Sequence, residues 1–229
     1  MNFDFNEEQT MIMDGIARYI REEYDFDRRR SIIESDSACS DDVWRQFAEL
    51  GWLSIPFDES YGGFGGHADD LAGVMLELGK GLIIEPYMST VVVFGSLLNA
   101  SNNDSLKEQL IPRIINGQYK GSFAYAEEQS RFEISDVKTS AQKCGDGYKL
   151  NGTKIAVIDA KESDGLIVTA RTGGSQYGAE GISLFLVDTS AEGVAVSSYN
   201  TMDSHSSSTI NLENVFVTEA NLIVHEGEG

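Results

Sequence analysis

The chain has 229 residues, enough for one large domain or two smaller domains with cores of their own. Its 37 acidic and 17 basic residues give a net charge of −20, which disfavours nucleic acid and anionic membranes as partners because both repel such a field. No apolar run reaches the roughly 18 residues of a membrane span, and the acidic start is not a secretory signal. Cys39 and Cys144 have no CxxC spacing, so a reducing, cytoplasmic location is expected.

The first half of the sequence has helical periods. Asn6, with Gln9 three positions later, has the pattern of a capping box, and Ser40 is expected to cap a second helix that ends at Gly51. Further helices are predicted around residues 71–78, after Pro86 and from Asn103 or Asp104 to residue 117, and the one after Pro86 is apolar on most sides and therefore buried.

Three connecting segments carry expectations of their own. The charged cluster at 21–30 is predicted to be a solvated helix end and connector, and an alternative phosphate site there is opposed by its own acidic residues. Residues 52–56 are predicted to be extended because Pro56 disfavours a helical Ile55. The glycine-rich stretch 61–66 is read as a tight inter-helix loop, with a ligand-touching loop as the alternative.

The second half has strand periods. Residues 121–126 alternate, 182–187 form an apolar and therefore central strand, and Asn151-Gly152 is the strongest hairpin-turn signal in the chain. The sequence thus predicts an α+β fold, with an all-α domain at 1–117 followed by an antiparallel β-barrel or sandwich domain at 118–229.

Several fixed spacings together point to one family. Leu50-Gly51-Trp52 with Pro56 and the stretch Tyr61 to Gly65 resemble the "LGW…P…YGGxG" segment of acyl-CoA dehydrogenases. The run from Asp136 through Lys154 resembles their "SD…KT…GDGYxLNGxK". Residues 123–131 and 181–188 are most similar to the small subunits of two-component acyl-CoA dehydrogenases, of the pimeloyl-CoA dehydrogenase type.

This resemblance implies an activity and a set of partners. The activity is FAD-dependent α,β-dehydrogenation of an acyl-CoA thioester, in which a carboxylate removes the α-proton and the flavin accepts the β-hydride. The implied partners are the acyl-CoA substrate, electron-transfer flavoprotein or a similar acceptor, and an oligomer formed with itself or with a larger acyl-CoA dehydrogenase subunit. The family's C-terminal four-helix domain, which supplies the catalytic base, is expected to be absent from this chain, so no catalytic residue is nominated and the chain alone is expected to be inactive.

The cofactor-binding candidates follow from the position of residues in the family motif. Rigid main-chain amides suit a flavin, so the motif nominates one strand segment and the segment that follows Lys154. The candidates are Phe123, Ala124, Tyr125, Ala126, Ala156, Val157 and Ile158. The family has Trp and Thr in the second segment, near the flavin, where this chain has Ala156 and Ile158. That departure supports an alternative function, a non-catalytic subunit that completes a partner's active site.

Two further candidates lie in the loop that replaces the family's "TEPxAGSD". The Ser130 hydroxyl and the Arg131 guanidinium suit a pyrophosphate, although Arg131 could instead pair with Glu127, Glu128 or Glu133. His67, His205 and His225 have no metal-ligand spacing and are expected to be ordinary surface or loop residues, so no metal is predicted.

Overall fold

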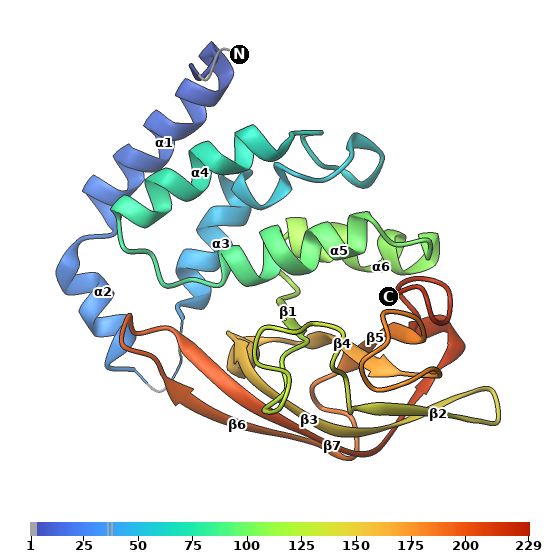
Figure 1. Cartoon of the computed structure of the whole chain (residues 1–229). Coiled ribbons are helices and arrows are strands. Elements are labelled where there is room, and N and C mark those ends of the chain that lie inside the picture. Colours follow the sequence, from blue (N-terminus) through green and yellow to red (C-terminus); the bar gives the residue numbers. More distant parts are fainter. Residues whose placement is uncertain (1–3, 36, 38) are drawn as a thin grey trace.

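The structure is a computed structural model that describes residues 4–35, 37 and 39–229. Its helices lie together on one side of the molecule and a curled sheet lies on the other (Figure 1). The helices are α1 (Glu7–Glu23), α2 (Phe26–Ile33), α3 (Asp41–Glu49), α4 (Ala68–Lys80), the π-helix η3 (Met88–Phe94) with its continuation α5 (Gly95–Asn99), and α6 (Asp104–Ile115). The strands are β1 (Gly121–Ala124), β2 (Ser140–Cys144), β3 (Gly147–Ile158), β4 (Gly165–Arg171), β5 (Ile182–Asp188), β6 (Val194–Asn200) and β7 (Ser206–Thr218). The predicted α+β fold is confirmed.

The helix starts follow the predicted caps. The Asn6 side chain accepts a hydrogen bond from Gln9 N, and Asn6 N donates to the Gln9 side chain, so the capping box of α1 is complete. Ser40 caps α3, and Asn103 caps α6 by accepting from Leu106 N. These short polar side chains satisfy amides that the helix itself leaves unpaired.

Two predictions in the helical half are wrong. The cluster at 21–30 contains a helix start, because Asp25 accepts a hydrogen bond from Arg28 N and caps α2. Residues 52–54 form a 3₁₀ turn and Ile55 is helical rather than extended. Trp52, Leu53 and Ile55 are all buried in the helical core, so tertiary packing outweighs the preference that Pro56 imposes on Ile55.

The helix predicted after Pro86 is buried and irregular. Its first part, η3, is a π-helix, and α5 continues from it without a break. Thr90 Oγ1 accepts from Gly121 N and donates to Gly121 O, both at 3.1 Å, so η3 is fastened to the start of β1. Such wide turns are rare and are frequently found at functional sites.

The strands form one mixed sheet in the order β1-β4-β2-β3-β7-β6, with β5 on β4. β1 runs parallel to β4, and most other pairs are antiparallel. β5 is buried through its first six positions but pairs as a strand only with β4. Residues 222–229 cover its other edge, where Ile223 N donates to Leu184 O and Gly229 N donates to Ile182 O.

The Asn151-Gly152 turn prediction is wrong, because both residues lie inside β3. The hairpin between β2 and β3 turns at Gly145-Asp146, where Cys144 pairs with Gly147 and Gly145 has φ 64°. Gly152 serves close packing instead, since a Cβ at this position would lie 2.4 Å from Thr139 Oγ1.

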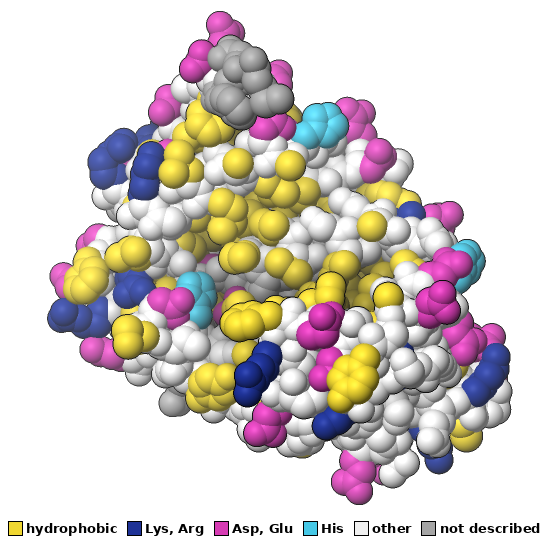
Figure 2. Space-filling model, in the orientation of Figure 1, with side chains coloured by type: hydrophobic (Ala, Val, Ile, Leu, Met, Phe, Trp, Pro, Cys, Tyr) yellow, Lys and Arg dark blue, Asp and Glu magenta, His cyan; other side chains and the backbone are white. Residues whose placement is uncertain are grey.

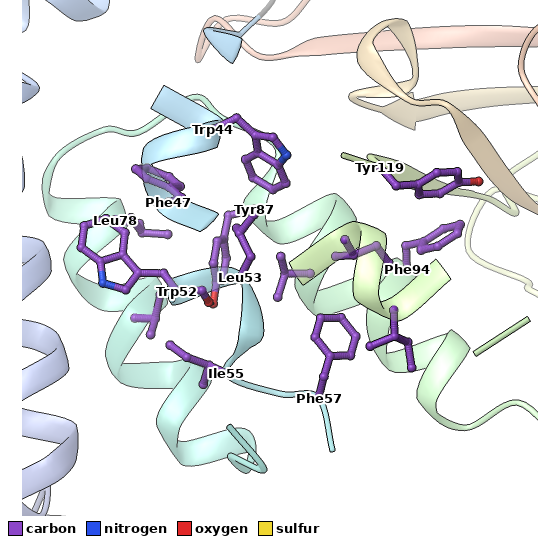
Figure 3. Close-up of a cluster of buried hydrophobic side chains, with 14 of the residues drawn as sticks. Trp44, Phe47, Trp52, Leu53, Ile55, Phe57, Leu78, Tyr87, Phe94 and Tyr119 are labelled. Carbon is purple, nitrogen blue, oxygen red and sulfur yellow. The ribbon is translucent and has the colours of Figure 1, made fainter. Parts of the chain in front are cut away.

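One hydrophobic core joins the helices to the sheet. Figure 3 shows aromatic side chains of the helical half gathered in this core. The ring centroids of Phe47 and Trp52 are 5.0 Å apart. The same cluster includes Ile167, Leu184 and Leu186 from the strands. A second cluster lies within the β half and includes Tyr148, Leu150 and Phe185. Among the residues that the structure describes, no helix is long and apolar enough to cross a membrane.

Candidate functional site

Two short segments of main chain lie side by side at the junction of the two halves. Ile155 N donates to Ala126 O at 2.9 Å, and Ser122 Oγ donates to Ile158 O at 2.8 Å. The segments 123–126 and 156–158, which the sequence nominated separately, are therefore neighbours. The arrangement needed for a shared binding edge is present.

The side chains of this edge divide between the core and the surface. Ala124 and Val157 are buried in the β core, so they offer only their main chain to a ligand. The rings of Phe123 and Tyr125 stack with centroids 5.1 Å apart and an interplanar angle of 24°. Tyr125 is 47% exposed and Ile158 is 52% exposed. A flat apolar group could pack against this surface.

The second segment is irregular. The register of β3 on β7 shifts between Leu150 and Gly152, and it shifts again between Lys154 and Val157. Ala156, inside the second shift, has φ 53°, and Asp159, just after it, has φ 57°. Left-handed backbone at non-glycine residues costs free energy and gathers at sites where the surroundings enforce it. A β-bulge of this kind also redirects the main chain.

The helical half forms the other wall of the junction. Besides the Thr90 contacts with Gly121, Ser89 Oγ donates to Asp159 Oδ2 at 2.7 Å. The exposed residue Met88 belongs to the same π-helix. Figure 2 shows hydrophobic side chains gathered across the middle of the molecule, over the hollow between the helices and the sheet. The junction therefore combines apolar surface with fixed main chain.

The two candidates in the loop, Ser130 and Arg131, differ in whether their side chains are free to bind a phosphate. Ser130 is buried, and its hydroxyl donates to Glu127 O and accepts from Glu127 N, so its only proton is used by the loop itself. Arg131 is exposed with φ 49°, and none of the ion pairs found among the described residues involves it. The expected alternative partner Glu127 is instead bound to Lys154. Arg131 is thus the candidate able to meet a phosphate.

Sequence reasoning missed the ion pair between Glu127 and Lys154, which are 3% and 0% exposed. Lys154 Nζ lies 2.7 Å from Glu127 Oε1. Burial pushes the pKa of Glu127 upward, but the Lys154 charge and hydrogen bonds outweigh it and hold that pKa at about 2. Burial lowers the pKa of Lys154 to about 8 against the opposing attraction of Glu127. One signal was available: Lys154 shares the alternation of Tyr148 and Leu150, which places it on the inward face.

A second polar cluster lies at the end of β3. His205 Nδ1 is 3.6 Å from Asp159 Oδ1, which is an electrostatic contact rather than a hydrogen bond. Interaction with Asp159 raises the pKa of His205 against the opposing effect of burial. His205 lies in the loop between β6 and β7, as expected of a loop residue, and its contact with Asp159 also connects that loop to the junction. No group of His, Cys, Asp and Glu among the described residues could hold a metal ion.

Two family models match the chain. The acyl-CoA dehydrogenase N-terminal domain matches residues 6–118 and the acyl-CoA dehydrogenase middle domain matches residues 122–215. The chain belongs to the acyl-CoA dehydrogenase family. Members of this family are flavoproteins that bind FAD, and the fold described above is that of their N-terminal and middle domains.

Individual relatives agree with this assignment. The chain is 30% identical to probable acyl-CoA dehydrogenase YngJ of Bacillus subtilis, covering 97% of this chain and 60% of that protein. It is 28% identical to mitochondrial isovaleryl-CoA dehydrogenase of Pongo abelii, over 98% of this chain and 54% of that one. The chain therefore spans 60% and 54% of the lengths of these two relatives.

Solved structures show the same fold. A chain in the structure described as the electron transferring flavoprotein of Acidaminococcus fermentans matches with a TM-score of 0.87 and 27% identity, over 100% of this chain and 61% of that one. The FAD complex of PigA matches with a TM-score of 0.89 and 24% identity, over 100% and 61% of the two chains.

Proposed function

We propose that this chain forms the N-terminal and middle part of an FAD-dependent acyl-CoA dehydrogenase, with Phe123–Ala126 and Ala156–Ile158 as the edge that contacts the flavin. The observation that carries the proposal is the hydrogen-bonded proximity of these two segments in a chain of this family. The exposed Tyr125 ring, stacked on the half-buried Phe123 ring, and the exposed Ile158 side chain suit a planar ring system. Arg131 suits the pyrophosphate, and Ser130 is left out because its hydroxyl is engaged.

The chemistry proposed is α,β-dehydrogenation of an acyl-CoA thioester. When bound, FAD supplies the acceptor for the hydride that leaves the β-carbon. The residues of this chain hold and orient the bound FAD, because main-chain amides on a strand are fixed dipoles that need no reorganisation during the reaction. The bulge at Ala156 redirects the main chain of this edge, and a ring bound over Tyr125 and Ile158 would exclude water from it. No residue of this chain is proposed as the catalytic base.

The proposal extends to an assembly. We infer that the chain acts together with a larger acyl-CoA dehydrogenase subunit, or with copies of itself, and passes electrons to electron-transfer flavoprotein or a similar acceptor. Residues 1–229 alone are expected to retain FAD weakly and to show little or no turnover. Steady turnover of an acyl-CoA by these residues without another subunit would contradict this part of the proposal.

The flavin edge is tested by the visible spectrum and the flavin stoichiometry of the protein purified with any subunit that accompanies it. Tyr125→Ala and Arg131→Gln should each reduce bound FAD several-fold, because one removes the stacking surface and the other removes the charge offered to the pyrophosphate. Phe216→Ala is the matched control, since Phe216 is 46% exposed and lies on β7 opposite Lys149, toward the other end of β3 from Ile158.

A second function is favoured by Ala156 and Ile158, which lack the ring and the hydroxyl of the family motif. It is that of a non-catalytic subunit that completes the active site of a partner. Under this alternative, Tyr125→Ala and Arg131→Gln leave the flavin stoichiometry of the assembly unchanged. A loss of FAD in either variant, with the Phe216→Ala control unaffected, rejects it.

A further inference from the structure

The Glu127–Lys154 pair is hydrogen-bonded to capacity. The three protons of Lys154 Nζ are directed to Glu127 Oε1 at 2.7 Å, Thr169 Oγ1 at 2.7 Å and Tyr125 O at 3.3 Å. Besides Lys154, the Glu127 carboxylate accepts from Thr139 N at 3.0 Å, from Lys138 N at 2.8 Å and from Gln129 Nε2 at 2.8 Å. Both charges are removed from water, so each depends on these partners.

These hydrogen bonds hold main-chain groups from separate parts of the sequence close together. Lys154 is the last residue of β3 in regular register before the bulge at Ala156, and its ammonium holds the carbonyl of Tyr125. Glu127 follows that segment and closes the loop 127–139 by holding the amides at its far end. One pair of side chains therefore fixes both segments of the proposed flavin edge and the loop that carries Arg131.

Stability alone does not account for this arrangement. A buried ion pair loses much of its attraction to desolvation, and a well-packed apolar pair of similar volume is often equally stable or more stable. What an apolar pair cannot do is hold a carbonyl and two amides at defined positions, because it offers no donors or acceptors. The contribution that only this pair can make is the geometry of the main chain.

We propose that Glu127 and Lys154 are positioning residues for the flavin edge, which hold Tyr125–Ala126 and the bulge at Ala156 in the arrangement that a flavin ring contacts. The inference rests on the proposed function, since it assigns a role toward FAD. It predicts that breaking the pair alters the edge even before any cofactor is added. Its first test therefore needs no flavin.

Hydrogen exchange on the flavin-free full chain follows the amides of Lys138, Thr139 and Ile155. Lys154→Met and Glu127→Gln should each raise exchange at these amides at least tenfold relative to amides in the middle of β7. Lys143→Met is the matched control, because Lys143 pairs with Glu219 at 2.9 Å on the surface of the same sheet, where both side chains are more than half exposed. Unchanged exchange at all three amides in both variants overturns the positioning role and leaves the proposed function intact.

FAD titration of the full chain, with its partner subunit where one copurifies, gives the second test. The double variant Glu127→Gln/Lys154→Met removes both charges, so its midpoint in urea should recover toward that of the wild type relative to the single variants. Its FAD affinity should stay at least tenfold weaker, and its flavin absorption band should lose fine structure. A double variant that binds FAD as tightly as the wild type overturns the positioning role. Absence of FAD binding by the wild type overturns the proposed function and this inference together.

Discussion

Glu85 is a carboxylate buried in the helical half, and no ion pair within the described part of the chain involves it. It is 3% exposed, its Oε1 accepts from Ser40 N at 3.4 Å, and its Oε2 has no hydrogen-bond partner among the residues that the structure describes. Burial raises the pKa of Glu85, and hydrogen bonds to its own backbone, to Tyr24 and to Ser40 oppose the rise only in part. Replacing Glu85 with Gln removes the charge and keeps the shape of the side chain, so it separates the free-energy cost of ionising Glu85 from the contribution of its packing.

We expect Glu85→Gln to change the pH dependence of stability. The folded protein holds this proton more tightly than the unfolded chain, so the wild type loses stability as pH rises from about 4.5 to the folded pKa, by about 1.4 kcal/mol per pH unit. The variant lacks that loss, so the difference between the two proteins grows with pH in this range. Urea unfolding at pH 4, 5.5 and 7 measures it, and a pH-independent difference would contradict the assignment.

His205 should also stabilise the fold more at low pH than at high pH, but here because the folded protein favours the charged form of the side chain. Asp159 raises its pKa, with a further contribution from Asp203, while burial and Arg29 oppose. Its stabilising effect is therefore complete below pH 6.5 and is lost as pH rises through the folded pKa. His205→Gln should cost up to about 1 kcal/mol at pH 5.5 and almost nothing at pH 9, measured by urea unfolding. Equal costs at both pH values would show that the effect is steric.

At the scale of single elements, β3 depends on the absence of a side chain at Gly152. Gly152→Ala should destabilise the protein by about 1–3 kcal/mol, because the added Cβ would meet the Thr139 side chain and main chain. Gly15→Ala is the matched control: Gly15 lies within α1 with nothing within 4 Å of its Cβ position, so that change should stabilise by about 0.5–1 kcal/mol. Thermal unfolding of both variants tests the pair, and a neutral Gly152→Ala would reject the packing role.

Elements with strictly local signals were predictable from the sequence. The caps Asn6, Ser40 and Asn103 act within three residues, so the sequence identifies the helix starts directly. Asn151-Gly152 was misread because the same dipeptide serves a tight turn and a close approach between strands, and only the packing of Thr139 distinguishes them. Ile55 was misread because its burial outweighs the effect of Pro56.

The candidate site was predictable as two stretches of motif and not as a three-dimensional arrangement. Position in the family motif nominated 123–126 and 156–158, but the hydrogen bonds that unite them depend on strand pairing. The roles of Glu127 and Lys154 were missed because these two residues lie 27 positions apart in the sequence and no local pattern links them. The Ser130 hydroxyl could not be assigned to its own turn before the loop geometry was known.

At the scale of the whole molecule, the helices and the sheet share a core, so they should unfold together. Both tryptophans, Trp44 and Trp52, lie in the helical half, while Ile167 lies on β4 within the same cluster. Ile167→Ala should therefore lower the midpoint seen by tryptophan fluorescence, with a loss of about 2–5 kcal/mol. Ile134→Ala, at a position that is 74% exposed, should leave it unchanged. Separate transitions for tryptophan fluorescence and for the β signal in circular dichroism would refute a common core.

The wide turn of η3 affects where the chain could lose a residue without losing the contact between its two halves. Within η3, Ser89 and Thr90 reach the sheet while Val91 and Phe94 remain in the helical core. A π-turn holds one residue more than an α-turn, so a single-residue deletion in this segment would restore ordinary winding. The turns on either side of the deleted residue would keep nearly the same rotational phase, because the π-turn had already absorbed one extra residue. A deletion in this segment that spares Ser89 and Thr90 would therefore leave the two halves joined, whereas a deletion inside α1 would rotate one part of that helix by about 100° relative to the other.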